Sequence, residues 1–172
     1  SAVSVALGMA AFSLGTDTAG SGRVPAALNC LVGYKPSLGA WSTKGVVPAC
    51  ASLDCVTVFA NSLEDAEKVN LAARGVDEEC CWSREYKEPL PKIPKKICLA
   101  KDGVTFYGPY EDIYKAKWEQ AKKRIEDMGI TVEYIDYTMF SKAASILYDG
   151  PWVAERWKDL GDFVESHPGK VF

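Results

Sequence analysis

The feature that most constrains the fold is an apolar run that leads into a glycine-rich turn near the start of the chain. Met9–Gly15 has the composition of a short buried strand, and Asp17–Arg23 places two glycines around one serine, Ser21. A short helix is predicted over Val24–Cys30, with a proline in its first turn, where the missing N–H costs no hydrogen bond. The order of strand, turn and helix would hold Ser21 at a defined point of the fold.

The remaining pattern alternates between helices and strands. Helices are predicted where apolar residues recur on one face and a glycine follows, and strands where apolar residues are concentrated or alternate with polar ones. The predicted helices are Ser1–Gly8, Asn61–Arg74, Tyr110–Met128 (with the stripe Tyr114, Trp118, Ala121, Ile125 and Met128) and Phe140–Val164, broken at Gly150-Pro151. The predicted strands are Lys96–Lys101 and Thr131–Tyr137, and Val76–Pro94 is predicted to be a surface loop. This alternation predicts an α/β domain.

Composition excludes several functional classes. The 172 residues carry a net charge of −3, without the basic footprint of a nucleic-acid-binding protein. No apolar run is long enough to span a bilayer, so no membrane partner is expected. The six cysteines form no C-x-x-C pair and there is one histidine, which argues against a structural zinc site. Scattered thiols favour a reducing compartment, the cytoplasm, and no motif for a metal or cofactor is present.

A serine on a glycine-rich turn can present its hydroxyl to a substrate at close range. The same turn leaves backbone N–H groups free just before a helix, where they could stabilise an oxyanion. Asp17 and Arg23 flank the turn and could pair to fix its shape. From these residues alone an ordinary loop is the better interpretation, because serine beside glycine is usually only part of a loop. A phosphate-binding loop is the other alternative, but the lysine expected after its glycines is missing.

The longer string resolves these alternatives. Leu14–Ala27 (LGTDTAGSGRVPAA), Leu31–Ser37 (LVGYKPS) and Gly45–Cys55 (GVVPACASLDC) together resemble the amidase-signature family. The resemblance implies an α/β fold with a mixed β-sheet core covered by helices on both sides. It also implies amide cleavage by a serine nucleophile, which maps onto Ser21, with an oxyanion hole at the backbone of Thr18, Ala19, Gly20 and Ser21.

Family members also use a second serine, in a cis peptide bond, and a lysine, and the resemblance places both before Ser1. Serine at its normal pKa needs a nearby base, so we expect this chain alone to be inactive. Lys35 matches a structural G-x-K-P element of the family instead of the catalytic lysine. Residues 1–172 are therefore expected to form one partial catalytic domain, truncated at both ends.

Two further segments resemble the allophanate hydrolase group of that family. One is Ser42–Val56, and the other is Leu147–Arg156 (LYDGPWVAER), whose tyrosine and arginine contact substrate in that group and map onto Tyr148 and Arg156. A guanidinium can hold the carboxylate of a small anionic amide with two parallel hydrogen bonds, and the phenol supplies a neutral partner. A solvated arginine and a packed tyrosine are the ordinary alternatives.

The resemblance implies hydrolysis of allophanate (urea-1-carboxylate) to ammonia and carbon dioxide, in urea degradation. A biotin-dependent urea carboxylase, fused or separate, is the implied protein partner. The alternatives are another amidase of the family, such as an indoleacetamide hydrolase or a transamidation subunit, and a fragment without activity of its own. The sequence does not determine the oligomeric state, and a homodimer is one arrangement open to it.

Overall fold

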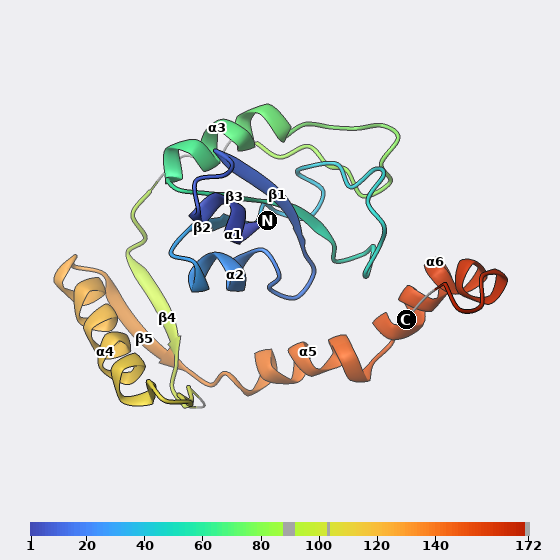
Figure 1. Cartoon of the computed structure of the whole chain (residues 1–172). Helices are drawn as coiled ribbons and strands as arrows, with labels where there is room; N and C mark the ends of the chain where they lie inside the picture. The colour runs from blue at the N-terminus through green and yellow to red at the C-terminus, as the bar shows by residue number, and fades with distance from the viewer. Residues whose placement is uncertain (88–91, 103, 171–172) are drawn as a thin grey trace. The chain divides into compact units, whose positions relative to one another are not determined.

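The computed structural model describes residues 1–87, 92–102 and 104–170. The chain divides into two compact units, unit 1 (Ser1–Lys87 with Leu147–Phe172) and unit 2 (Glu88–Ile146). The elements, labelled in Figure 1, are α1 (Ala2–Ala6), β1 (Phe12–Asp17), α2 (Arg23–Leu28), β2 (Val32–Tyr34), β3 (Cys55–Ala60), α3 (Leu63–Ala73), β4 (Lys96–Ala100), α4 (Glu111–Asp127), β5 (Thr131–Ile135), α5 (Thr138–Asp149) and α6 (Trp152–Ser166).

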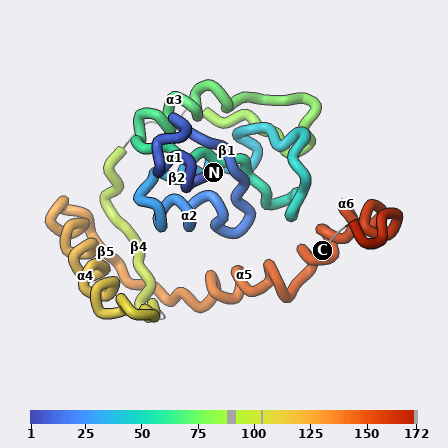
Figure 2. Tube along the Cα trace, in the orientation of Figure 1, coloured from blue at the N-terminus to red at the C-terminus, as the bar shows by residue number. Residues whose placement is uncertain are grey.

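Unit 1 is built on a three-stranded antiparallel sheet in the order β1-β3-β2. Successive side chains of the central strand β3 point to opposite faces of the sheet. Phe59 packs in one cluster with residues of α1 and α2, whereas Val58 and Ala60 pack in another with Ala66 of α3. The tube trace also shows α2 and α3 on opposite sides of this sheet (Figure 2). Helices therefore cover both faces, as predicted.

Unit 2 pairs two parallel strands, β4 and β5, with helix α4 packed on β5. Parallel and antiparallel pairing thus both occur, but in two separate sheets. The predicted stripe of α4 is half-buried at Trp118, Ala121 and Ile125, while Tyr114 and Met128 near its ends are exposed. A 17-residue helix is roughly 25 Å long and a five-residue strand roughly 17 Å, so the strands cannot cover both ends of the stripe.

The α/β class is confirmed, and so are most predicted elements. Ser62 caps α3, because its hydroxyl accepts a hydrogen bond from the backbone N–H of Asp65. Gly150-Pro151 separates α5 from α6, again as predicted. The predicted loop Val76–Pro94 contains no helix or strand in its described part, and residues 88–91 of it lie outside the described residues.

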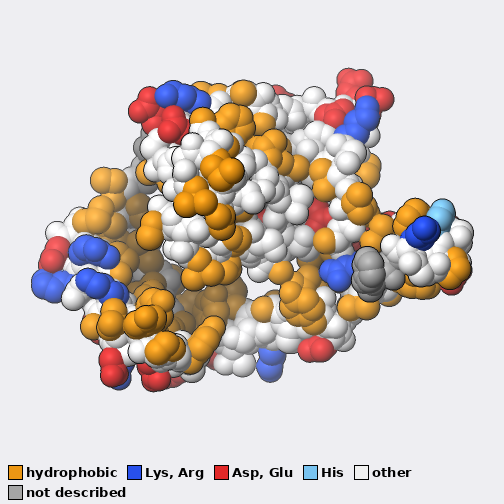
Figure 3. Space-filling view, in the orientation of Figure 1, with side chains coloured by type: hydrophobic (Ala, Val, Ile, Leu, Met, Phe, Trp, Pro, Cys, Tyr) orange, Lys and Arg blue, Asp and Glu red, His pale blue; other side chains and the backbone are white. Residues whose placement is uncertain are grey.

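Many large apolar side chains remain on the surface. Figure 3 shows hydrophobic side chains over much of the visible face of unit 1, and several residues in or directly after α1, β1 and α2 are about half exposed or more: Val3, Leu7, Phe12, Leu14, Val24 and Leu28. Exposed apolar surface, where it is contiguous, is typical of interaction surfaces and ligand-binding grooves. Among the described residues, no helix has the length and apolar character needed to cross a membrane.

Candidate active site

Asp17 organises the turn that carries Ser21, here called the Ser21 turn (residues 17–23). Its side chain is fully buried, and each carboxylate oxygen accepts one backbone and one guanidinium hydrogen bond. Oδ1 accepts from the N–H of Gly20 (2.7 Å) and from Arg23 Nη2 (3.1 Å). Oδ2 accepts from the N–H of Gly22 (3.1 Å) and from Arg23 Nε (2.9 Å). The expected pairing of Asp17 with Arg23 is present, and the same carboxylate also fixes the backbone of the turn.

These contacts set the charge of Asp17. Burial raises the pKa of the carboxyl, but the hydrogen bonds from Arg23, Gly20 and Gly22 outweigh burial and leave the pKa below its usual value. The side chain of Arg23 is 54% exposed, so water solvates its guanidinium, whereas the carboxylate of Asp17 is shielded from solvent. The turn therefore contains a permanently ionised acceptor at neutral pH.

Ser21 lies at the surface, two residues before the start of α2. Its hydroxyl makes no hydrogen bond with any other described residue and is therefore open to a ligand. The glycine after it is required by close packing: a Cβ at Gly22 would lie 2.6 Å from Oγ1 of Thr57 on β3. The turn is thus pressed against the central strand, which leaves Ser21 on the outer side.

The backbone N–H groups of the turn divide into two kinds. Gly20, whose φ is +135°, donates its N–H to Asp17. Within the residues that the structure describes, the N–H groups of Thr18, Ala19 and Ser21 have no hydrogen-bond acceptor. Three of the four amides expected in an oxyanion hole are therefore open, and the fourth holds the turn in place.

A second buried carboxylate, which the sequence analysis did not assign, anchors the neighbouring loop. Asp54 is 3% exposed and accepts hydrogen bonds from the N–H groups of Ala49 (2.8 Å) and Cys50 (3.1 and 3.2 Å). It also accepts a hydrogen bond from the hydroxyl of Thr18. The loop of residues 48–54, here called the Asp54 loop, is thereby joined to the Ser21 turn.

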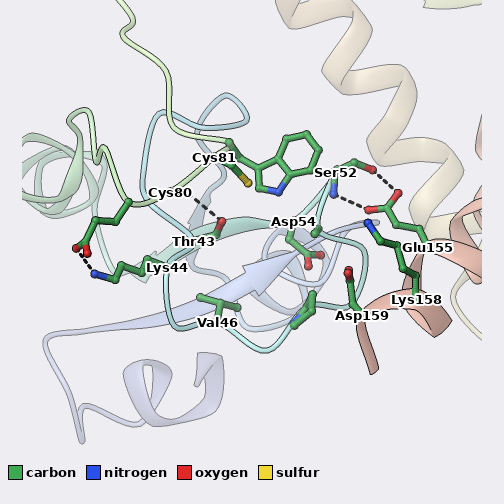
Figure 4. A pocket seen from close by; sticks show the side chains of 14 residues that line it. Thr43, Lys44, Val46, Ser52, Asp54, Cys80, Cys81, Glu155, Lys158 and Asp159 are labelled. Atoms are coloured by element: carbon green, nitrogen blue, oxygen red, sulfur yellow. Dashed lines mark hydrogen bonds and ion pairs between the residues drawn. The ribbon is translucent and has the colours of Figure 1, made fainter. Parts of the chain in front are cut away.

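Helix α6 binds the same loop through two consecutive residues. The two oxygens of Glu155 accept hydrogen bonds from the N–H (2.8 Å) and the hydroxyl (2.7 Å) of Ser52, as Figure 4 shows. Arg156 donates from Nε to the carbonyl oxygen of Ala49. The hydrogen bonds from Ser52 lower the pKa of Glu155, which is therefore ionised at neutral pH.

Tyr148 stands apart from these contacts. It lies in the last turn of α5, it is 70% exposed, and its hydroxyl makes no hydrogen bond with the described residues. The structure therefore links Arg156 to the Ser21 turn through the Asp54 loop, and within the described part of the chain no hydrogen bond joins the Tyr148 hydroxyl to either.

A cavity of about 700 Å³ opens beside the Asp54 loop (Figure 4). Its wall carries charges of both signs together with two adjacent thiols, at Lys44, Glu79, Cys80, Cys81, Glu155 and Lys158. Burial raises the pKa of Cys80, but hydrogen bonds from Thr43 and nearby groups outweigh burial and lower the pKa to about 7. Cys50, next to Asp54, has a raised pKa because it is buried. Ser21 does not line this cavity.

Comparison with known proteins identifies the family. The model of the family described as Amidase matches residues 1–166. The chain belongs to the amidase family. It is 43% identical over 98% of its length to a urea amidolyase of Lachancea kluyveri and 41% identical over 99% to that of Saccharomyces cerevisiae. It spans 9% of the length of these curated relatives.

Solved amidase structures have the same fold. The allophanate hydrolase of Kluyveromyces lactis superposes with a TM-score of 0.90 at 42% identity, over 98% of this chain and 28% of that one. The peptide amidase of Stenotrophomonas maltophilia superposes with a TM-score of 0.70 at 25% identity, over 96% of this chain and 35% of that one. The resemblance inferred from the motifs is therefore confirmed along nearly the whole chain.

Proposed function

We propose that the full-length protein containing this amidase chain hydrolyses allophanate through an acyl-enzyme on Ser21. The observation that carries the proposal is the Ser21 turn, in which an exposed serine lies beside three open backbone N–H groups, and which the buried Asp17 carboxylate holds through the N–H groups of Gly20 and Gly22. The likeness to the K. lactis allophanate hydrolase supports the choice of substrate.

In the proposed reaction the Ser21 hydroxyl oxygen attacks the carbonyl carbon of the primary amide. Its proton passes to a second serine and a lysine, the pair of residues that the family resemblance implies. The developing oxyanion accepts hydrogen bonds from the open amides of Thr18, Ala19 and Ser21. The N–H of Gly20 serves indirectly, because its bond to Asp17 keeps the neighbouring peptide planes in position. Loss of one oxyanion donor typically lowers turnover about 10²- to 10³-fold.

The amide C–N bond then breaks and ammonia leaves with the transferred proton. Water attacks the acyl-enzyme and releases the dicarboxylate, which decomposes to ammonia and carbon dioxide. Preorganised backbone donors suit this chemistry because they need no rearrangement when the negative charge forms.

Arg156 and Tyr148 are the proposed substrate-binding residues. The Nε–H of Arg156 is occupied by the carbonyl of Ala49, whereas its two terminal nitrogens form no hydrogen bond with the described residues. That leaves one edge of the guanidinium open for a carboxylate, which it can hold with two parallel hydrogen bonds. The exposed phenol of Tyr148 supplies the proposed second contact.

The proposed partner is a biotin-dependent urea carboxylase, which would supply allophanate by carboxylating urea. The name urea amidolyase of the two curated relatives supports a fused arrangement. We place the protein in the cytoplasm, because all six cysteines are free thiols. A homodimer remains the proposed assembly to be tested by sedimentation.

The test is ammonia release from allophanate by the full-length protein. Ser21→Ala should abolish turnover because it removes the nucleophile, whereas Ser166→Ala, a matched change at the exposed end of α6, should leave it unchanged. Near-normal turnover in Ser21→Ala would show that another residue is the nucleophile. Hydrolysis of an uncharged amide without hydrolysis of allophanate would retain Ser21 and remove Arg156 and Tyr148 as carboxylate-binding residues.

A further inference from the structure

We infer that Glu155 is a positioning residue that aims the guanidinium of Arg156 at the substrate, by clamping α6 to the Asp54 loop. The inference rests on the proposed function of Arg156 and extends it to a residue that does not itself touch substrate. The contacts that carry it are those of Glu155 with Ser52 and of Arg156 with Ala49.

The clamp has two attachment points on each side. Glu155 and Arg156 are neighbours on α6, and their side chains leave the helix in directions about 100° apart. Their partners Ser52 and Ala49 are three residues apart on the same loop. The two contacts start from different residues of α6 and end on different residues of the Asp54 loop. Together they prevent α6 from rotating about its axis, which a single contact would not do. The direction of the Arg156 side chain is therefore fixed.

The carboxylate of Glu155 is suited to this role because both of its oxygens are used. One accepts the N–H of Ser52 and the other accepts its hydroxyl, so the loop is held by backbone and side chain together. The ionised state that these bonds favour makes them stronger than bonds to a neutral amide. A glutamine has one acceptor oxygen and no charge, so it can keep the bond from the Ser52 N–H only with its NH₂ group facing the Ser52 hydroxyl, which would then accept instead of donate, and both bonds would lose the strengthening by charge.

The clamp also bears on the nucleophile, through the Asp54 loop. Asp54 holds the N–H groups of Ala49 and Cys50 and the hydroxyl of Thr18, the first residue after Asp17 in the Ser21 turn. The Asp54 loop therefore contacts both Arg156 and the Ser21 turn, and it sets the position of one relative to the other. A loose clamp should misplace the substrate carboxylate relative to Ser21 while the turn itself stays formed.

The experiment measures kcat and KM for allophanate in the full-length protein with Glu155→Gln, alone and combined with Arg156→Lys. Misalignment of about 1 Å can cost about 100-fold, so we expect Glu155→Gln to lower kcat/KM about 10- to 100-fold, mainly by raising KM. In the Arg156→Lys background, where no guanidinium remains to be aimed, Glu155→Gln should cost less than about 2-fold. Glu165→Gln, an exposed glutamate on the same helix, is the matched control and should change nothing.

An equal loss in both backgrounds would overturn the inference, because it would show a structural role independent of Arg156. Unchanged kinetics in Glu155→Gln would also overturn it. If Glu155→Gln fails to fold, Ser52→Ala weakens the clamp from the other side by removing the hydroxyl donor and should raise KM in the same way. Absence of allophanate hydrolysis by the unaltered protein would refute the proposed function itself, and the inference with it.

Discussion

Replacing Asp17 by asparagine tests how the Ser21 turn is held. Each oxygen of Asp17 accepts one backbone N–H and one N–H of Arg23, so either orientation of the asparagine amide keeps two of these bonds and turns its NH₂ group toward the other two donors. A hydrogen bond to a charged group contributes about 1.5–3 kcal/mol, and a buried donor left unpaired costs a similar amount. The bond lost from Arg23 counts for roughly 1 kcal/mol or less, because that side chain is largely solvated.

We therefore expect Asp17→Asn to lower the free energy of unfolding by about 2–4 kcal/mol and to abolish most turnover. The assay is equilibrium unfolding of the full-length protein in urea, with Ser21→Ala as the control, because Ser21 is exposed and its hydroxyl has no partner in the described chain. A loss smaller than about 0.5 kcal/mol, within the range of ordinary surface substitutions, would refute this account of the turn.

The same variant should alter the response to acid. The pKa of Asp17 is lower in the folded protein than in the unfolded chain, so its stabilising contribution is complete above about pH 4 and is lost as the pH falls through the folded value. Asparagine does not titrate. The difference in unfolding free energy between Asp17→Asn and the unaltered protein should therefore narrow below about pH 4, and a constant difference down to about pH 2 would contradict the assignment.

Two further predictions concern packing and thiol chemistry. Gly22→Ala would bring a methyl group to 2.6 Å from Oγ1 of Thr57 and should lower the free energy of unfolding in urea by about 1–3 kcal/mol. Adding Thr57→Ala to this variant should restore part of the lost stability. No recovery in the double variant would contradict the clash. Alkylation of Cys80 by iodoacetamide, followed by peptide mass spectrometry, should show a midpoint near pH 7 because its pKa is about 7, and a midpoint near the ordinary value of about 8.5 would contradict this.

Local features of the fold were predictable from the sequence. The pairing of Asp17 with Arg23 joins residues six positions apart, and side-chain chemistry at such spacing is visible in the printed string. The break between α5 and α6 was equally visible at Gly150-Pro151. Both features depend on residues close together in the sequence, which is why the sequence predicts them.

The long-range contacts were not predictable in the same way. Asp54 belongs to the string Gly45–Cys55, and its position between the apolar residues Leu53 and Cys55 indicates only that a buried carboxylate needs hydrogen-bond donors. Nothing in the sequence indicates that one of those donors is Thr18, 36 residues earlier. Glu155 stands in the string Leu147–Arg156 with no sign of its partner, because Ser52 is 103 residues away. Such pairs are fixed by the three-dimensional packing and not by spacing.

The difference in sequence separation also sets an order of events during biosynthesis. The bonds of Asp17 span three to six residues, so the Ser21 turn needs only its own stretch and β3, against which it packs, to have left the ribosome. Glu155 emerges 103 residues after Ser52, which at about 5–20 residues per second is a delay of roughly 5–20 s. During that interval the nascent chain can contain the Ser21 turn and the Asp54 loop without α6. A translational pause before Glu155 would lengthen the interval.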